Sequence, residues 1–261
     1  MGFRAAAFAA ALSLLPQVAL AQNAGPALAA AAAPGHRDAA NVARDGARHP
    51  VPSLEFWGLK PGMTVIEIAP GGGYWSEILA PYARATNGKY IAATGSPTQK
   101  LPAKFENAAT YGTIGYTVFS GSSGALAPAG SADMVITARN IHNWIPQGSA
   151  EKAFRDFHAA LKPGGILAVE EHRSDPRPTG PRAPTGYVHT DDVIALATKA
   201  GFRLAERSEI NANPKDTKDH ADGVWTLPPT RRGPTTGAKD RAAYDAIGES
   251  DRMTLRFVKP A

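Results

Sequence analysis

The feature that most constrains this chain is an apolar run that ends in three successive glycines. Residues 65–68 (Val-Ile-Glu-Ile) predict a buried strand, and residues 76–80 return to helical spacing. Glycines in a turn between strand and helix let a ligand approach the backbone, and free amides at the helix end favour electron-rich groups. Glu67 is placed to accept hydrogen bonds from an ammonium or hydroxyl group of that ligand. On the glycines alone, a plain tight connection is an equally good interpretation.

The spacing of this stretch resembles motif I of the class I S-adenosylmethionine-dependent methyltransferases, E/D-x-G-x-G-x-G. Glu67 matches the acidic residue, and Gly71 and Gly73 match the second and third glycines. Ala69 stands where the motif has its first glycine. The resemblance implies that S-adenosylmethionine is the cofactor and that its methionine end binds at this loop. The cofactor-binding residues it implies here are Glu67, Ala69, Pro70, Gly71, Gly72, Gly73 and Tyr74.

The order of the remaining elements supports the same fold. The turn at residues 162–165 (Lys-Pro-Gly-Gly) resembles the L-x-P-G-G element of this class. We therefore expect an α/β, Rossmann-like class I methyltransferase fold with a seven-stranded, mostly parallel sheet, whose antiparallel last strand inserts beside the sixth. The later strands are predicted at residues 89–93, 116–119, 132–137 and 166–172, from residue 201, and at 253–258.

Two acidic residues that the resemblance leads us to expect are missing. After the second strand, where the class usually binds the ribose hydroxyls, the chain has Thr94-Gly95-Ser96; after the third, it has Ser120-Gly121-Ser122. The hydroxyls of Thr94 and Ser122 are the candidates to replace these carboxylates at the cofactor. A neutral hydrogen bond is about half as strong as a charge-assisted one, so weaker or altered cofactor binding stays open.

The second informative stretch is A-R-N-I-H-N-W-I-P at residues 138–146, directly after the fourth predicted strand. Ligands of open parallel sheets bind beyond the carboxyl ends of the strands, so this stretch is expected beside the glycine loop. His142 is the candidate general base, because histidine ordinarily titrates near working pH. Asn140 and Asn143 are expected to orient the acceptor, Asn140 next to the cofactor as well, and Trp144 to form an apolar wall.

Two further interpretations concern this region. Glu171 and His172, after the fifth strand, are the second choice for the base, although a satisfied surface pair explains them equally well. Asn140 and Asn143 have a purely structural alternative, in which both amides bond the backbone of a turn. In that alternative His142 only caps a helix.

The first 21 residues are predicted to be a secretory signal peptide. Arg4 gives a positive start, residues 5–15 are apolar, and Ala19-Leu20-Ala21 is a small-x-small cleavage site, so cutting is expected after Ala21. The chain contains no cysteine, which excludes lipid attachment, disulfides and thiolate chemistry. We expect a periplasmic or secreted protein without a stable membrane anchor. Residues 22–43 are predicted to be a flexible tether and residues 44–261 one methyltransferase-like domain.

The formal charge of +5 comes from 28 basic and 23 acidic residues scattered along the chain. Because they form no stripe, no nucleic-acid partner is expected, and the substrate is expected to be a small molecule. The segment at residues 211–251 is longer than an ordinary connection, which favours a function for it. Its Asp and His residues could ligate a divalent metal or form a solvated turn before Trp225. They are Asp216, Asp219, His220 and Asp222.

From about Arg44 to Lys259 the chain resembles a predicted exported methyltransferase family of bacteria. The shared sequences are P-G-G-G-x-x-x-E-I-L-A-P, R-N-x-H-N-W, N-P-x-D, D-G-V-W-T-L-P-P and R-M-T-L-x-F-V-K-P. The resemblance implies methyl transfer from S-adenosylmethionine to an unidentified small-molecule or envelope acceptor. Two alternatives remain open: a non-catalytic protein that binds a nucleoside-like ligand, and a metal-dependent enzyme that uses residues 216–222.

Overall fold

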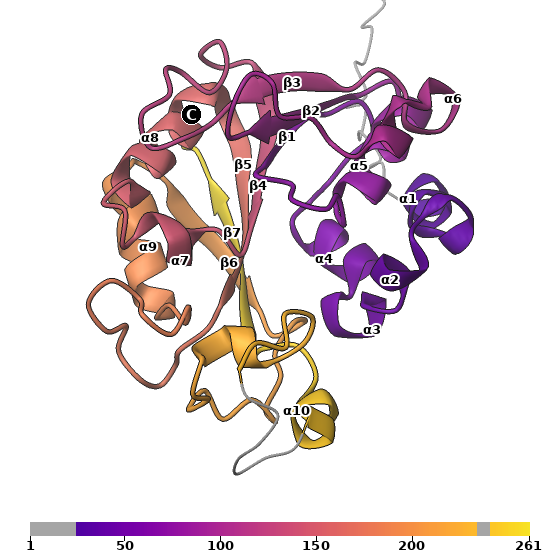
Figure 1. Cartoon of the computed structure of the whole chain (residues 1–261). Helices are drawn as coiled ribbons and strands as arrows, with labels where there is room; N and C mark the ends of the chain where they lie inside the picture. Colours follow the sequence, from indigo (N-terminus) through magenta and orange to yellow (C-terminus); the bar gives the residue numbers. More distant parts are fainter. Residues whose placement is uncertain (1–24, 234–240) are drawn as a thin grey trace, which may run out of the picture.

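A seven-stranded sheet with the strand order β3-β2-β1-β4-β5-β7-β6 forms the centre of the computed structural model, which describes residues 25–233 and 241–261 (Figure 1). The pairs among β1 to β5 are parallel, and β7 is antiparallel to both β5 and β6. This topology confirms the predicted fold class, including the insertion of the last strand beside the sixth. The strands are β1 (Thr64–Ile68), β2 (Lys89–Thr94), β3 (Gly115–Val118), β4 (Ala132–Ala138), β5 (Leu161–His172), β6 (Arg203–Ser208) and β7 (Arg252–Val258).

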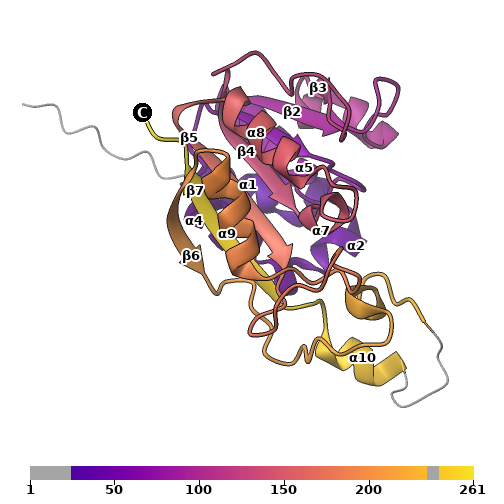
Figure 2. The same ribbon diagram turned by 90° about the vertical axis from the view of Figure 1, so that its left-hand side faces the viewer.

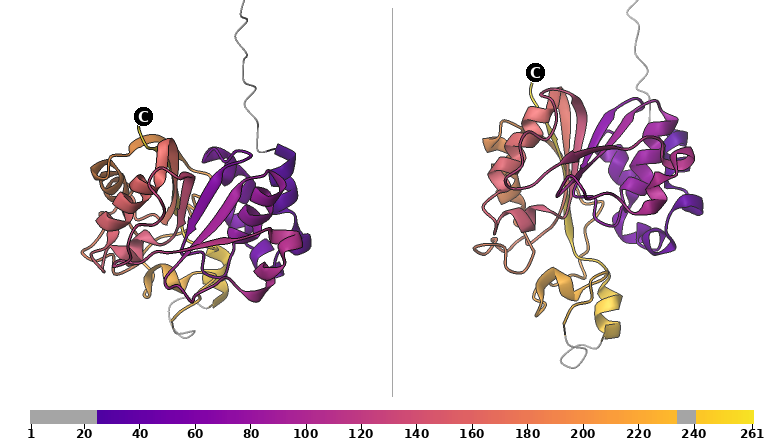
Figure 3. Two further views of the ribbon diagram at one scale, coloured as in Figure 1. Left: turned by 90° about the horizontal axis from the view of Figure 1, so that it is seen from above. Right: turned by 45° about the horizontal axis from the view of Figure 1, so that its top comes forward.

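Helices cover both faces of the sheet, which gives three layers (Figures 1 and 3). One face carries α1 (Gly25–Ala32), α4 (Pro50–Phe56) and α5 (Ser76–Ala85). The other carries α7 (Ile141–Trp144), α8 (Ala150–Ala160) and α9 (Thr190–Lys199), which face the viewer in Figure 2. The other helical elements are η1 (Pro34–His36), α2 (Ala39–Val42), α3 (Asp45–Arg48), η2 (Ala103–Glu106), α6 (Ala108–Tyr111), η3 (Gly223–Thr226) and α10 (Arg241–Ile247).

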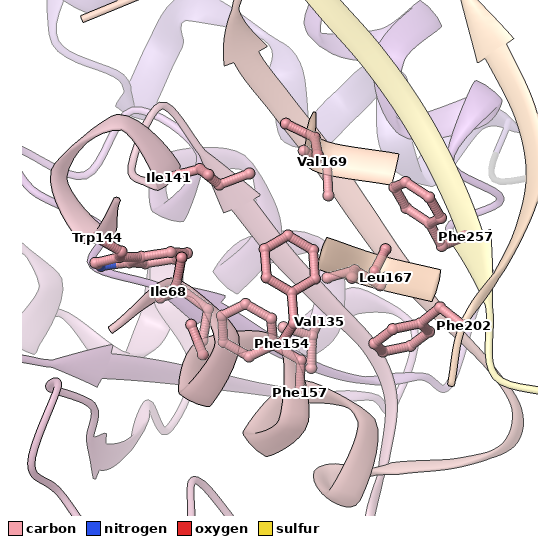
Figure 4. Packing of buried hydrophobic residues seen from close by; sticks show 14 of the residues in the cluster. Ile68, Val135, Ile141, Trp144, Phe154, Phe157, Leu167, Val169, Phe202 and Phe257 are labelled. Carbon is pink, nitrogen blue, oxygen red and sulfur yellow. The ribbon is translucent and has the colours of Figure 1, made fainter. Parts of the chain in front are cut away.

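Each face of the sheet has its own apolar core. Under α7, α8 and α9 lies a cluster that contains Phe154, Phe157 and Leu167, all three fully buried (Figure 4). Under α1, α4 and α5 lies a second cluster with Leu28 and Trp57, which are also fully buried. Because both faces of the parallel strands are covered, the strands are apolar on both sides, as the near-continuous apolar runs in the sequence indicate.

The amino-terminal segment differs from its prediction as a flexible tether. Within the described residues 25–43, α1 packs against α4 and α5, with Leu28 at 0% exposure and Ala31 at 5%. Alanine is the strongest helix former, and one buried leucine fixes the alanine-rich helix to the domain. The predicted signal peptide and its cleavage site lie outside the described residues. None of the described helices has the length and apolar character needed to cross a membrane.

The segment between β6 and β7 lies beyond the carboxyl ends of the parallel strands, at the bottom of Figure 1. Its last residue before β7, Asp251, accepts hydrogen bonds from Arg173 Nη2 at 2.9 Å and from the backbone N of Asn213 at 2.8 Å. The ammonium of Lys218 lies 2.8 Å from the same carboxylate. These contacts hold the described part of the segment against the edge of the sheet where ligands bind in such folds.

Replacement of Phe154 by alanine is expected to lower the free energy of unfolding by about 3–5 kcal/mol, because it leaves a cavity in the core under α8. Urea denaturation measures the change. Arg155→Ala on the same helix is the control: the Arg155 side chain is 62% exposed, so its removal should stay within about 0.5 kcal/mol. A loss below about 1 kcal/mol for Phe154→Ala would contradict the packing described here.

Candidate functional site

A cleft with a volume of about 340 Å³ opens at the carboxyl ends of β1, β4 and β5. Its size falls within the range of small-molecule sites, roughly 300–1,000 Å³. Five parts of the chain line it: the glycine loop after β1, the residues that follow β4, the end of β5, the helices α2 and α3, and the segment between β6 and β7. The sheet edge predicted to hold the ligand therefore contains a cavity.

The glycine loop forms one wall of the cleft. Gly73 has φ +87°, and a Cβ atom there would lie 2.6 Å from the ring of Phe105, so only glycine fits. Gly72 is different, because a Cβ atom there would meet no protein atom within 4 Å. Ala69, where the motif has a glycine, adopts φ +48°, which explains why glycine is favoured at this position. The loop thus leaves open space on the side of Gly72.

Glu67 lies at the base of the loop and is only 4% exposed. Its Oε2 accepts hydrogen bonds from Ser76 Oγ at 2.7 Å and from the hydroxyl of Tyr90 at 2.5 Å. Burial raises the pKa of the Glu67 carboxyl to about 7, and these hydrogen bonds oppose the rise only in part. No described residue bonds Oε1, so this oxygen is left on the cleft side of the strand end, where it accepts hydrogen bonds when the carboxyl is ionised.

Asn140 joins the ends of β1 and β4. Its Nδ2 donates to the backbone O of Ile68 at 3.0 Å and to Thr137 Oγ1 at 3.3 Å. The amide oxygen of Asn140 has no bond to a described residue, and the side chain lines the cleft. Asn140 and Glu67 therefore present two acceptor oxygens near the glycine loop, which suits a ligand with an ammonium group.

His142 and Glu171 form a buried pair beside the cleft. Glu171 Oε1 lies 2.9 Å from His142 Nδ1, and both residues are nearly inaccessible to solvent, at 0% and 6% exposure. Glu171 also accepts hydrogen bonds from the backbone N of Ile141 at 2.6 Å and of His172 at 2.8 Å. Because the Glu171 oxygen beside Nδ1 is an acceptor, the geometry suits the tautomer of His142 that donates from Nδ1 and leaves Nε2 as the other ring nitrogen.

His172 lies next to this pair, with its ring centroid 5.2 Å from that of His142. Its Nδ1 is 2.5 Å from Ser250 Oγ. Burial holds the pKa of His172 well below its usual range, and the nearby His142, Arg139 and Arg252 lower it further. His172 is therefore neutral at physiological pH. The interpretation of Glu171 and His172 as a satisfied surface pair is wrong, because Glu171 is 0% exposed and its Oε1 lies 2.9 Å from His142 Nδ1. Glu171 pairs with His142 instead.

Potential metal ligands were found in one group of described residues. His142, Glu171 and His172 bring one candidate ligand atom each within 4.8 Å of one another. Both oxygens of Glu171 already accept two hydrogen bonds each, so the group fits a hydrogen-bonded pair better than a metal site.

The acidic cluster at residues 216–222, for which the sequence leaves metal binding and a solvated turn both open, has a structural role. Asp216 is buried and accepts hydrogen bonds from Tyr187 OH at 2.9 Å, from the backbone N of Lys218 at 3.0 Å and from that of Asp251 at 2.8 Å. His220 Nε2 lies 2.8 Å from the same carboxylate. Four donors surround Asp216, so it fixes the segment to the domain, and the geometry does not support the metal-dependent alternative.

The structure brings most of the predicted site residues together and separates four of them. Thr94 is buried and donates its hydroxyl to the backbone O of Ser96 at 3.1 Å, whereas Ser122 and Asn143 are exposed. Trp144 packs in the core 5.3 Å from the ring of Phe119, so its prediction as an acceptor wall is wrong. Four of the predicted site residues lie outside the cleft lining, namely Gly73, Thr94, Ser122 and Asn143. The other eight line the cleft: Glu67, Ala69, Pro70, Gly71, Gly72, Tyr74, Asn140 and His142.

The sequence analysis missed the arginines of the cleft. Arg44 and Arg48 reach it from the segment before β1, and both bond Glu249, at 2.8 Å and 2.9 Å. Their spacing of four residues was the available signal, because residues four apart share one face of a helix. Arg139 belongs to the stretch after β4 but was not assigned a role.

Comparisons with known proteins agree with the fold. No protein-family model matches the sequence, and the search of curated proteins finds no match either. Similar solved structures include the [4+2]-cyclase SpnF, with 15% identity, a TM-score of 0.56 and coverage of 82% of this chain and 80% of that one. A SAM-dependent methyltransferase from Aquifex aeolicus has 17% identity, a TM-score of 0.52 and coverage of 83% and 93%.

A third similar structure contains ligands. It is the 1,6-didemethyltoxoflavin-N1-methyltransferase of Burkholderia thailandensis with bound 1,6-didemethyltoxoflavin and S-adenosylhomocysteine, at 12% identity and a TM-score of 0.52, covering 86% of this chain and 80% of that one. At such identities the similarity establishes the fold alone. The chain has the Rossmann-like fold of class I methyltransferases, and its activity has to be argued from the cleft.

Glu67→Gln is expected to change how stability depends on pH. Between pH 4.5 and about 7 the Glu67 carboxyl ionises in the unfolded chain but keeps its proton in the folded one, so a rise in pH lowers the free energy of unfolding. Relative to Glu67→Gln, the native protein should lose on the order of 3 kcal/mol over this range. Urea denaturation at a series of pH values measures the difference. Parallel curves for the two proteins would show that the carboxyl is not buried as described.

Proposed function

We propose that this protein transfers a methyl group from S-adenosylmethionine to a small organic acceptor. One observation carries the proposal: the glycine loop and the His142–Glu171 pair face a single cleft in a class I methyltransferase fold. The loop suits the cofactor, and the pair suits an acceptor that must lose a proton. Solved structures of similar fold include methyltransferases, which supports this assignment.

The residues of the cleft fit the amino-acid half of the cofactor. The free acceptor oxygens of Glu67 and Asn140 suit its ammonium group, and the open side of Gly72 gives it room. When bound, S-adenosylmethionine supplies a methyl group on a positively charged sulfur, which needs no covalent help from the protein. The chain has to hold the acceptor in line and remove its proton where necessary.

His142 is the group that removes this proton. Its Nε2 keeps a lone pair because Nδ1 donates to Glu171 at 2.9 Å, and the side chain lines the cleft. Glu171 orients the ring and stabilises the positive charge that forms when Nε2 takes the proton. Trp225, from the segment between β6 and β7, lies edge-on to His142 with ring centroids 6.0 Å apart and limits access of water to it.

The proposal includes the compartment in which the protein acts. The predicted signal peptide supports export to the periplasm or the medium, where small molecules or envelope components are the available acceptors. The absence of a charged stripe in the sequence favours a small-molecule acceptor over nucleic acid.

A second candidate is a binding protein that holds a nucleoside-like ligand without methyl transfer. The observation in its favour is that Thr94, at the position of the ribose-binding acid, is buried and donates its hydroxyl to Ser96 O. A fold of this class also occurs in a protein titled as a cyclase, so the fold leaves the chemistry open. Detection of methylated product decides between the two candidates.

Gly72→Ala is expected to weaken binding of S-adenosylhomocysteine about tenfold or more, because the added methyl group takes up space at the glycine loop. The fold should tolerate the change, since no protein atom lies within 4 Å of the new Cβ atom. Calorimetric titration measures the affinity. Gly35→Ala is the matched control, because Gly35 is equally open but does not line the cleft. Equal affinity in all three proteins would place the cofactor elsewhere.

His142→Gln is expected to bind S-adenosylhomocysteine as the native protein does but to lower methyl transfer by about 10²–10⁴-fold. The assay incubates protein with S-adenosylmethionine and a small-molecule extract of bacterial cells, and mass spectrometry quantifies the S-adenosylhomocysteine formed. If the native protein binds the cofactor and yet forms no product with any extract, the binding-protein candidate replaces the enzyme. Unchanged product formation by His142→Gln would remove His142 from the mechanism.

A further inference from the structure

The cleft contains more positive than negative charge. Arg44, Arg48 and Arg139 line it, and Glu249 is the acidic partner nearest to the first two. Glu249 is shared with a further arginine, because Arg252 Nη1 lies 3.2 Å from its Oε2. Three guanidinium groups therefore share Glu249, and among the described residues only Arg252 has a second carboxylate, Glu170, at 2.6 Å. This leaves the arginines of the cleft incompletely neutralised.

Arg139 has the fewest hydrogen-bond partners of these arginines. Its guanidinium makes no hydrogen bond with any described residue, and its Nε is buried. The nearest carboxylate, Glu170, lies 4.0 Å from Nε and already accepts a hydrogen bond from Arg252 at 2.6 Å. Burial lowers the pKa of Arg139, and Glu170 compensates only in part. A guanidinium with a buried Nε that has no hydrogen-bond acceptor is costly, so a ligand is the natural partner for it.

The position of Arg139 directs it toward the ligand site. Its backbone adopts φ +59°, a left-handed conformation that residues other than glycine rarely take. Its neighbour Asn140 joins the strand ends, and His142 is three residues further on. Backbone strain of this kind is typical of residues held in place for binding or catalysis. The side chain is 22% exposed, so part of it is open to the cleft.

Arg48 adds a second guanidinium that is only partly paired, because it bonds Glu249 through Nε alone. It is fully buried, and its Nη1 and Nη2 have no partner among the described residues. Its Cζ lies 4.5 Å from the ring centroid of Tyr74, so the cation stacks on an aromatic wall of the cleft. Arg44 lies beside it, bonded to Glu249 through Nε. Together these arginines make the cleft attractive to an anion.

We infer that Arg139, supported by the charges of Arg44 and Arg48, forms a subsite that binds a carboxylate group of a ligand. The inference rests on the proposed function and adds a chemical class to it. If the carboxylate belongs to the acceptor, the acceptor is an organic acid whose acid group binds Arg139 while its protic group faces His142. The amino-acid half of the cofactor carries the same group and is the other source.

The first arm of the test uses no cofactor, so it can succeed or fail independently of methyl transfer. Calorimetric titrations compare benzoate with benzamide, which match in shape and differ in charge. The native protein should prefer benzoate about tenfold or more, and Arg139→Met should abolish this preference without changing the affinity for benzamide. Arg155→Met is the control at an exposed position, and it should leave the preference unchanged.

The second arm identifies the other source of the carboxylate. It compares S-adenosylhomocysteine with 5′-methylthioadenosine, which lacks the amino-acid part. A loss of about tenfold in Arg139→Met for the first ligand alone assigns the subsite to the cofactor. A loss for benzoate alone assigns it to an organic acid as acceptor.

Arg139→Met should fold, because the native guanidinium makes no hydrogen bond with the described residues; its melting temperature should equal or exceed that of the native protein. The inference is overturned if Arg139→Met changes the affinity for neither benzoate nor S-adenosylhomocysteine, or if the native protein binds neither. It is also overturned if Arg139→Met is strongly destabilised, because Arg139 would then form an ion pair with Glu170 that stabilises the fold. Arg139→Lys keeps the charge and should retain part of the benzoate preference.

Discussion

The cleft depends on buried ion pairs that join three distant parts of the chain. Arg48, at the end of α3, bonds Glu249 at 2.9 Å, and Arg252, at the start of β7, bonds Glu170 of β5 at 2.6 Å. Arg252 also donates to the backbone O of Ala47 at 2.6 Å. Buried ion pairs of this kind contribute little net stability, but removal of one partner leaves the other charge buried and unpaired, which lowers the free energy of unfolding by about 3–5 kcal/mol. The walls of the cleft are therefore held in one relative position.

Two strained residues lie where this framework meets the sheet. Ala69 after β1 and Arg139 after β4 both adopt positive φ, at +48° and +59°. Side by side in the sheet, β1 and β4 end at the same edge, and the Asn140 amide connects them through the backbone O of Ile68. Each such residue costs on the order of 1–3 kcal/mol, and the surrounding hydrogen bonds maintain it. The strain directs the loop and the arginine to the same cavity.

Much of the fold could be predicted from local patterns. Six strands were expected within one or two residues of their places, because β-branched runs bounded by glycine or proline are strong local signals. The exception is β5, which begins at Leu161 and includes the predicted turn at residues 162–165. The prediction of a tether before Arg44 failed because alanine-rich sequence is compatible with both a coil and a helix, and the contact of Leu28 with α5 decides between them. The prediction that Trp144 forms a wall for the acceptor failed for a similar reason, because the direction of its side chain depends on packing with Phe119 and Phe157.

The sequence by itself determined the strand, glycine turn and helix, the places of the other strands along the chain, and the presence of His142 and Asn140 after β4. These are local or sequential properties, set by glycine conformation and by apolar periodicity. The tertiary structure alone decided that Glu171 pairs with His142, that Asp216 is a structural acceptor, and that Arg139 makes no hydrogen bond with a described residue. Such facts depend on which distant groups share a low-dielectric space, where an unpaired charge matters most, and no sequence spacing encodes them.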